Sequence, residues 1–416
     1  MAGERLIPHV GCSVVVLLDE RSATIFKCCS IGDYLSEVSV LYYGRYKDCM
    51  KKALFITTIG MVKESGGVRY SKSILDAMGE SLDVSVLVLS DIQYFRSRLL
   101  RFLFSLFVGL LRRVPPNVAF HSGLFLRIPK ELLAAHWDVL VIDHLEAAVV
   151  AKRFKSRLKI YVAHNIESDL IDFKLSRFPF FARKLYQEWV KSFEVDFIQS
   201  VNGVVTISSA EAGWFKMLCK DVVTIYPIFK ASTRLKFSST RHCSKLRLGF
   251  LGEAGWGPNR EAVDVLVDKI LPLVSRDVDV VFAGAGWGNS QTQSLILNRQ
   301  PKCSTFEFPG YIPDIKDYWA SIDVFVAPIL SGAGVNVKIC EALANGVFVI
   351  ALPHAIRGLN DRILGCGGVA VVDTNNAFAA AIDRFDMSDA DFQPPVEFSQ
   401  PYSRNVWASL LQKLAA

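Results

Sequence analysis

The sequence lacks several features that would mark other classes of protein. Its nine cysteines form no CxxC pair and no Cys/His spacing suited to zinc, which argues against a structural zinc site and favours reduced thiols in a cytosol. No stretch has the roughly 18–20 uninterrupted apolar residues of a membrane-spanning helix. The apolar run Val14–Leu18 is too short for the core of a typical signal peptide. A P-loop, a nucleophile elbow, solenoid repeats and low-complexity tracts are also missing.

Positive charge is concentrated in one part of the chain. The segment from Tyr94 to Ile160 has 12 Lys/Arg against 4 Asp/Glu, whereas the whole chain of 416 residues has a formal net charge of +6. Within this segment, Tyr94–Val114 is largely apolar and edged by arginines. The pattern fits a helix lying on an anionic membrane, and it equally fits a helix packed inside a domain with its arginines in water. No nucleic-acid-binding motif is present, so nucleic acid is not an expected partner.

Length and composition predict two globular domains, because the chain is too long for one ordinary core and 51% of it is apolar. Residues 1–49 show no clean alternation of strands and helices and are predicted to be an extension that the function can lose. Met50-Lys51-Lys52 then precedes the apolar run ALFITT. The polar, basic stretch Lys230–Lys245 is predicted to link a first domain at 50–229 to a second at 246–387. Residues 388–416 are predicted to form a C-terminal helix region that packs back toward the first domain.

Short runs rich in Val, Ile and Leu alternate with helical stretches in both domains. Such runs, apolar on both faces, are typical of buried parallel strands. Two βαβ series predict an α/β protein with two Rossmann-like domains and a cleft lined by the carboxyl ends of the strands. The predicted strands are Ala53–Thr58, Val84–Leu89, Val139–Asp143, Lys159–Ala163, Val204–Ser208 and Val222–Tyr226, then Leu246–Leu251, Val278–Ala283, Thr305–Phe308, Val324–Ala327, Val347–Ala351 and Val369–Val372.

The stretch Ser331–Ile350, SGAGVNVKICEALANGVFVI, predicts an anion cradle. Gly332 and Gly334 allow close backbone approach to a ligand, and the start of the following helix offers N–H groups and a positive dipole end to phosphate. Lys338 and Glu341 are three residues apart and so project from one face, a cation for a diphosphate and a carboxylate for ribose hydroxyls. An ordinary amphipathic helix with an exposed Lys–Glu pair is the alternative. The opposite, apolar face comprises Val335, Ile339, Ala342 and Leu343.

Glycines and polar residues follow other predicted strands, at the edge where this fold class binds ligands. Gly66 and Gly67 precede a predicted helix and suit an anion or sugar, although turn chemistry explains them as well. His164 follows a strand and is either a cleft residue or a structural histidine. The other candidates at strand ends are Asp143, His144, Glu146, Gly252, Asn259 and Gly284.

Several of these segments together resemble the retaining family 4 glycosyltransferases, which have the GT-B architecture. In the second half the matching segments are LGFLGEAGWGPNREAVDVLVDKILP, VDVVFAGAG, FPGYIPDIKDYWASIDVFVAPI and GAGVNVKICEALANGVFVIA. In the first half they are ALFITT with SGGVRYS, HNIES and FEVDFIQSVNGVVTISSAE. The resemblance covers about Lys52 to Ala416, and it depends on several motifs that occur in the family's order.

The resemblance implies roles for individual positions. Glu341 matches the second glutamate of the family's EX7E motif, which holds the nucleotide ribose, and His164 matches a histidine beside the donor sugar. Backbone N–H groups of Gly332, Ala333, Gly334 and Val335 would bind the diphosphate and donor sugar. Tyr311 and Ile312 would lie near the base, Gly252, Asn259 and Gly284 would line the donor site, and Gly66, Gly67, His144 and Glu146 would lie on the acceptor side.

The sequence also departs from the family's pattern. Ala333 stands where the first EX7E glutamate belongs, so one side-chain contact to the donor sugar is missing. The usual arginine and lysine of the first donor-domain loop fall at about Glu253 and Asn259. A departing diphosphate needs a nearby cation, so Lys338 is expected to take over that task.

The sequence therefore predicts a retaining glycosyltransferase of the hexosyltransferase type. It would move a sugar from a nucleotide-diphosphate sugar to an acceptor hydroxyl, without a metal or cofactor, in the synthesis of envelope polysaccharide or glycolipid. The expected catalytic residues are His164, Lys338 and Glu341. The protein is expected in the cytoplasm, with peripheral contact to an anionic membrane through 94–114. A nucleotide-sugar epimerase or hydrolase of the same fold and a non-catalytic binding protein remain alternatives.

Overall fold

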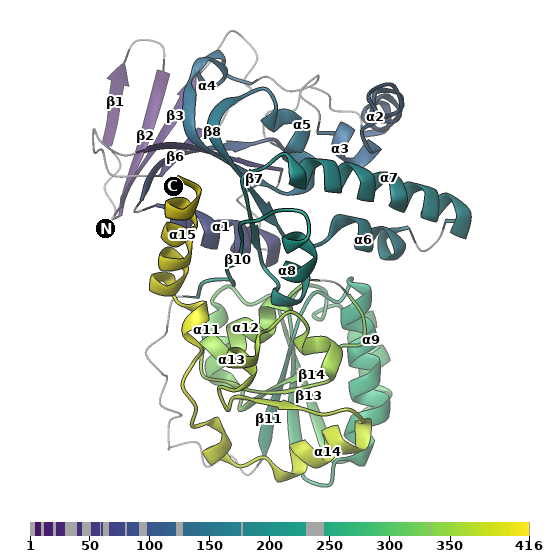
Figure 1. Ribbon diagram of the computed structural model, residues 1–416. Coiled ribbons are helices and arrows are strands. Elements are labelled where there is room, and N and C mark those ends of the chain that lie inside the picture. The colour runs from purple at the N-terminus through teal and green to yellow at the C-terminus, as the bar shows by residue number, and fades with distance from the viewer. Residues whose placement is uncertain are drawn as a thin grey trace. The chain divides into compact units, whose positions relative to one another are not determined.

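The computed structural model describes residues 5–9, 12–19, 22–29, 40–43, 51–58, 60, 66–79, 81–90, 98–121, 128–175, 178–229, 245–332 and 334–415. The chain forms two compact units, Met1–Tyr226 together with Ser403–Ala416, and Pro227–Tyr402. Both have alternating strands and helices (Figure 1). The predicted linker falls mostly on residues 230–244, which lie outside the described part of the chain.

The first unit is built on a parallel sheet extended by antiparallel strands. The strand order is β1-β2-β3-β4-β6-β5-β7-β8-β9-β10, and the strands from β6 to β10 pair in parallel. Residues 1–49 contribute four antiparallel strands, β1 (Arg5–His9), β2 (Cys12–Asp19), β3 (Ser22–Cys29) and β4 (Val40–Tyr43), with β4 paired to β6. The parallel strands are β5 (Lys51–Thr57), β6 (Leu82–Val88), β7 (His136–Asp143), β8 (Lys155–Ala163), β9 (Gly203–Thr206) and β10 (Val222–Thr224).

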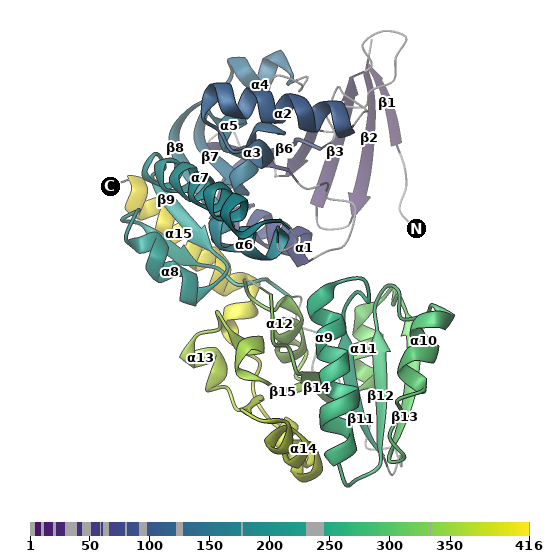
Figure 2. The ribbon, with the colours of Figure 1, turned by 90° about the vertical axis from the view of Figure 1, so that its right-hand side faces the viewer.

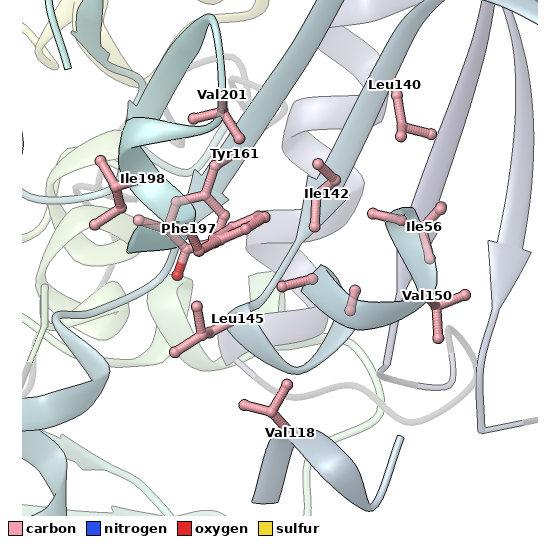
Figure 3. Close-up of a cluster of buried hydrophobic side chains, with 14 of the residues drawn as sticks. Ile56, Val118, Leu140, Ile142, Leu145, Val150, Tyr161, Phe197, Ile198 and Val201 are labelled. Carbon is pink, nitrogen blue, oxygen red and sulfur yellow. The ribbon is translucent and has the colours of Figure 1, made fainter. Parts of the chain in front are cut away.

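Helices of the first unit cover this sheet because its strands are apolar on both faces. Figure 3 shows the core under one face, where Ile56, Ile142 and Tyr161 from three strands meet Val150 and Phe197 from two helices. The helices are α1 (Gly66–Met78), α2 (Arg98–Arg112), α3 (Pro116–Ala119), α4 (Lys130–Ala134), α5 (Ala148–Ala151), α6 (Glu167–Lys174), α7 (Phe180–Gln199), α8 (Ser209–Lys216) and α15 (Gln400–Ala415).

The C-terminal segment is divided between the units. Phe398 and Glu397 are buried in the second unit, where the N–H of Phe229 donates to the carbonyl of Phe398 (3.0 Å). That unit therefore extends to Tyr402. The rest of α15 packs in the first unit, where a leucine methyl of Leu414 lies 3.1 Å from the position that a Cβ on Gly203 would occupy.

The second unit has a six-stranded parallel sheet in the order β13-β12-β11-β14-β15-β16. All twelve predicted strands of the two units are confirmed, with ends shifted by a few residues. The strands are β11 (Leu246–Leu251), β12 (Val278–Ala283), β13 (Ser304–Gly310), β14 (Val324–Ala327), β15 (Phe348–Ala351) and β16 (Val369–Val371). The helices are α9 (Gly257–Val265), α10 (Ser290–Leu297), α11 (Ile315–Ser321), α12 (Val337–Ala344), α13 (Asp361–Leu364) and α14 (Asn375–Arg384).

Candidate functional site

The topology of the second unit places the glycine-rich segments together. From β11 the chain builds β12 and β13 on one side, and β14 then returns to the other side of β11. Ligands of open α/β sheets bind outside the carboxyl ends of strands at such a reversal. Gly252 follows β11, and Ser331 to Gly334 follow β14, so both segments lie at this point.

Gly252 is enclosed by the residues that follow β12. A side chain on Gly284, which has a φ of +123°, would collide with the carbonyl oxygen of Gly252, and the indole N–H of Trp287 donates to that same oxygen (2.6 Å). A Cβ on Gly252 itself would lie 2.6 Å from the amide nitrogen of Asn259 and 2.7 Å from Nζ of Lys338. Position 252 therefore requires glycine, because the polar groups of Asn259 and Lys338 occupy the space that a side chain would need.

Lys338 is the cation at this strand end. Its ammonium donates to Oδ1 of Asn259 (2.6 Å), and Nδ2 of Asn259 donates to the carbonyl of Glu253 (2.8 Å). The ammonium also lies 5.5 Å from the ring centroid of Phe250. Burial lowers the pKa of Lys338 to about 8. A desolvated ammonium held by a neutral amide is well placed to gain an anionic partner.

The predicted glycine turn precedes α12. Gly332 and Gly334 have φ angles of +116° and +67°, which favour glycine, and Ala333 lies outside the described residues. Asn336 makes no side-chain cap at the start of α12. Glu341 is only 5% exposed. The alternative of an exposed Lys–Glu pair is therefore wrong, whereas the predicted apolar face of Val335, Ile339, Ala342 and Leu343 is buried.

Arg357 is a cation near this turn that the sequence reasoning did not select. One guanidinium nitrogen lies 3.3 Å from the Cβ position of Gly332, and the other donates to the carbonyl of His354 (3.0 Å). Burial lowers the pKa of His354, and the charge of Arg357 lowers it further. In the sequence, His354 and Arg357 could have been selected because they follow β15, the strand next to β14.

Tyr311 and Ile312 follow β13, on the other side of β12 from Gly252. The ring of Tyr311 is 66% exposed, and Ile312 is half-buried. Because β13 is separated from β11 by β12, the two residues lie to one side of Gly252 and Lys338, at the rim of this strand edge.

The first unit has its own strand reversal, between β5 and β7, and a buried carboxylate lies there. Asp143 ends β7 and is fully buried. Its Oδ2 accepts hydrogen bonds from Thr57 at the end of β5 and from Ser71 of α1 (both 2.7 Å), and its Oδ1 lies 2.7 Å from Nε2 of His164. A carboxylate can only accept, so Nε2 of His164 carries the proton and a neutral ring presents Nδ1 as an acceptor.

Burial opposes ionisation of Asp143, but the two imidazoles and the hydrogen bonds from His164 and Thr57 outweigh it. The pKa of Asp143 is therefore lowered to about 2. His144 has a φ of +71°, which is rare for a residue with a side chain, and its ring stacks on His164 with centroids 3.7 Å apart. Burial and the neighbouring imidazole lower the pKa of His144.

The same three side chains also satisfy the spacing of a metal site. One ligand atom each from Asp143, His144 and His164 lies within 4.8 Å of the others. However, both oxygens of Asp143 already accept protein hydrogen bonds, and one of these engages Nε2 of His164. Asp143 and His164 are therefore already satisfied by protein hydrogen bonds, whereas the buried Nε2 of His144 has no hydrogen-bond partner among the described residues.

Glu194 of α7, which the sequence reasoning did not select, supports the loop after His164. Its carboxylate accepts hydrogen bonds from the N–H groups of Glu167 and Ser168 at the start of α6 (2.9 and 3.1 Å). Burial raises its pKa to about 7. Of the other predicted acceptor-side residues, Gly66 and Gly67 begin α1, and Glu146 is half-buried in the turn after β7.

Comparison with known proteins adds a family match and a fold. Residues 245–385 match the family model described as "Glycosyl transferases group 1". No curated protein matches the chain in sequence. The solved structures that resemble it include Anabaena HepE (Alr3699) in complex with UDP, with a TM-score of 0.57 and 16% identity over 87% of this chain and 100% of that one.

The apo form of the lipopolysaccharide outer core galactosyltransferase WaaB is also similar, with a TM-score of 0.55 and 12% identity over 88% of this chain and 99% of that one. At these identities the likeness establishes the fold. The chain therefore has the GT-B fold with two Rossmann-like domains, and its second unit matches the family model of group 1 glycosyl transferases.

Proposed function

We propose that the protein is a retaining glycosyltransferase that moves a sugar from a nucleotide-diphosphate sugar to an acceptor hydroxyl. The observation that carries the proposal is the half-buried ammonium of Lys338, held by Asn259 against Gly252 at the strand reversal of the second unit. The family match of residues 245–385 supports it. So does the fold shared with HepE, a protein solved in complex with UDP and with UDP-glucose.

The chemistry of this step centres on the leaving group. As the bond between the sugar and the diphosphate breaks, negative charge grows on the diphosphate. Lys338 and the N–H groups at the start of α12 would stabilise that charge, and the guanidinium of Arg357 beside Gly332 adds a second cation. Lys338 and Arg357 would then neutralise the diphosphate in place of the arginine and lysine that are missing from the loop after β11.

In this proposal the carboxylate of Glu341 binds the ribose hydroxyls of the nucleotide, and His164 contacts the donor sugar. The ring of His164 is oriented by Asp143, and His144 stacked on it would limit its movement. No metal is required in this proposal, because Lys338 and Arg357 supply the positive charge. The acceptor would be an envelope polysaccharide or glycolipid precursor, reached at the cytoplasmic face of a membrane.

The decisive experiment is donor turnover. A thermal-shift panel of UDP-, GDP- and ADP-sugars should identify one nucleotide that raises the melting temperature, because a ligand of the native state stabilises it. Transfer of that sugar to an acceptor, in the presence of EDTA, would support a metal-independent transferase. Donor turnover without any acceptor would instead favour a hydrolase or epimerase. Binding without turnover would favour a non-catalytic binding protein.

Nucleotide affinity should fall as the pH rises through about 8. The pKa of Lys338 is lowered to about 8 by burial, so the free protein loses this ammonium above that pH. If the nucleotide binds only the protonated form of Lys338, its Kd should rise by up to about tenfold between neutral pH and one unit above this pKa. Calorimetry with the nucleotide diphosphate across this range measures it. Lys338→Arg keeps its charge and should flatten the profile, and an unchanged slope in that variant would assign the titration to another group.

Replacing Glu341 with glutamine should weaken nucleotide binding by about tenfold, because an amide is a poorer acceptor for two ribose hydroxyls than a carboxylate. Calorimetry with the ribonucleotide and its 2′-deoxy form measures the effect. The variant should lose most of the preference for the ribonucleotide. Equal losses for both forms would place Glu341 outside ribose recognition.

A further inference from the structure

Helix α2 exposes most of its apolar residues. Ser105 and Val108 form the buried line of the helix, at 0% and 6% exposure. The alternative of a helix packed inside the domain is therefore wrong. The apolar residues that are more than a third exposed are Leu100, Phe102, Leu103, Phe104, Leu106, Phe107, Leu110 and Leu111. Contiguous apolar exposure on this scale marks an interaction surface.

The start of helix α7 also exposes large apolar side chains. Phe180, Phe181 and Leu185 are 66%, 74% and 58% exposed. Figures 1 and 2 show α2 and α7 in the same region of the first unit, with α3 between them. One hydrogen bond joins them: the indole N–H of Trp189 in α7 donates to the carbonyl of Arg113 just after α2 (3.3 Å). This hydrogen bond joins the end of α2 to the middle of α7, so the two helices are connected within the first unit.

Cations accompany both helices. Between Asp91 and Glu131 the chain has seven Lys/Arg and no acidic residue. Arg112 and Arg113 are exposed at the end of α2. In α7 the charged groups of Arg183 and Lys184 lie 5.6 and 6.0 Å from the ring centroid of Phe180. Apolar side chains edged by cations are complementary to acyl chains beneath anionic headgroups.

We infer that α2 and the start of α7 together form a docking surface for an anionic lipid membrane. In the described residues no helix is long and apolar enough to cross a bilayer. The 15 residues of α2 would extend about 22 Å, shorter than the roughly 30 Å hydrocarbon core. Helix α2 therefore lies along the membrane surface, and α7 adds a second apolar contact that fixes the orientation of the unit.

A second copy of the chain suits this surface less well. A symmetric dimer would bring the same patch of both copies together, and the arginines at the end of α2 would then face like charges. An anionic membrane neutralises them instead. The inference does not depend on the donor chemistry proposed above, so it can fail or hold independently of it.

Vesicle flotation of the full chain tests this inference. The protein should float with vesicles of phosphatidylcholine and phosphatidylglycerol, more weakly at high salt, and not with phosphatidylcholine alone. The double variant Phe107→Ser/Leu111→Ser in α2 and the double variant Phe180→Ser/Phe181→Ser in α7 should each lower the bound fraction by about tenfold, because each removes two large exposed apolar groups that would be buried in the membrane. Leu295→Ser/Met217→Ser, which changes residues 68% and 74% exposed elsewhere, is the matched control and should bind normally.

Circular dichroism and thermal unfolding verify that the variants remain folded. Absence of flotation with anionic vesicles, or equal binding to neutral ones, would overturn the inference. Loss of binding in the α2 variant with normal binding in the α7 variant would overturn the two-helix surface. A concentration-dependent dimer, abolished by the α2 variant in light scattering, would assign the patch to a second copy instead.

Discussion

Replacing Lys338 with methionine should reduce turnover by about a hundredfold or more while leaving the fold intact. Removing one group that stabilises developing negative charge in a water-poor site typically costs a factor of about 10²–10³ in rate. Methionine keeps the apolar stem of the side chain and removes only the charged end, including the ammonium that lies 5.5 Å from the ring centroid of Phe250. Steady-state kinetics with the donor found by thermal shift measures the effect.

The matched control for Lys338 is Lys316, at the start of α11 in the same unit. Lys316→Met should leave turnover unchanged, because its side chain is exposed and makes no contact with the glycine turn among the described residues. The folded state of Lys338→Met should be at least as stable as the parent at neutral pH, because burial of an ammonium is unfavourable. Near-normal turnover in the Lys338 variant would remove this residue from the mechanism.

Replacing Asp143 with alanine should have the largest effect on stability. Thr57, Ser71 and His164 would each lose a buried acceptor, and leaving buried polar groups unsatisfied costs about 3 kcal/mol or more in the free energy of unfolding. His164 would also lose the carboxylate that fixes its tautomer, so turnover should fall by about tenfold to a hundredfold. Urea unfolding and steady-state kinetics measure the two effects.

Asp138→Ala is the matched control, because Asp138 lies on the same strand and accepts one exposed hydrogen bond from the N–H of Lys52 (2.8 Å). It should cost about 1 kcal/mol or less. The pH dependence gives a second test. The folded-state pKa of Asp143 is lowered from 3.8 to about 2, so its contribution is present above about pH 4 and is lost as the pH falls toward 2. In Asp143→Ala this part of the acid dependence should disappear, and an unaltered acid profile would contradict the role.

Local patterns were sufficient for the strands and for the turn before α12. Buried parallel strands are apolar on both faces, so runs such as Leu246–Leu251 and Val278–Ala283 identify them without ambiguity. Gly332 and Gly334 likewise indicated a turn before a helix that carries Lys338, and the structure gives both glycines a positive φ. Both features depend on neighbours in the sequence.

Features that depend on distant segments were not predictable in this way. The contact of Asp143 with Thr57 and Ser71 joins residues 86 and 72 positions apart, and it exists because β5 and β7 are adjacent at the strand reversal. Arg357 reaches Gly332 only because β15 lies next to β14. Glu194 had no distinguishing signal, because a glutamate in a long helix is ordinarily exposed.

The paired glycines at the ends of β11 and β12 have a consequence for engineering. Because any side chain on Gly252 would strike Lys338 and Asn259, and any side chain on Gly284 would strike the preceding loop, libraries that randomise these two codons should return only the parental residue among active clones. Altered donor preference would have to be sought elsewhere, and the solvent-facing ring of Tyr311 offers room for it.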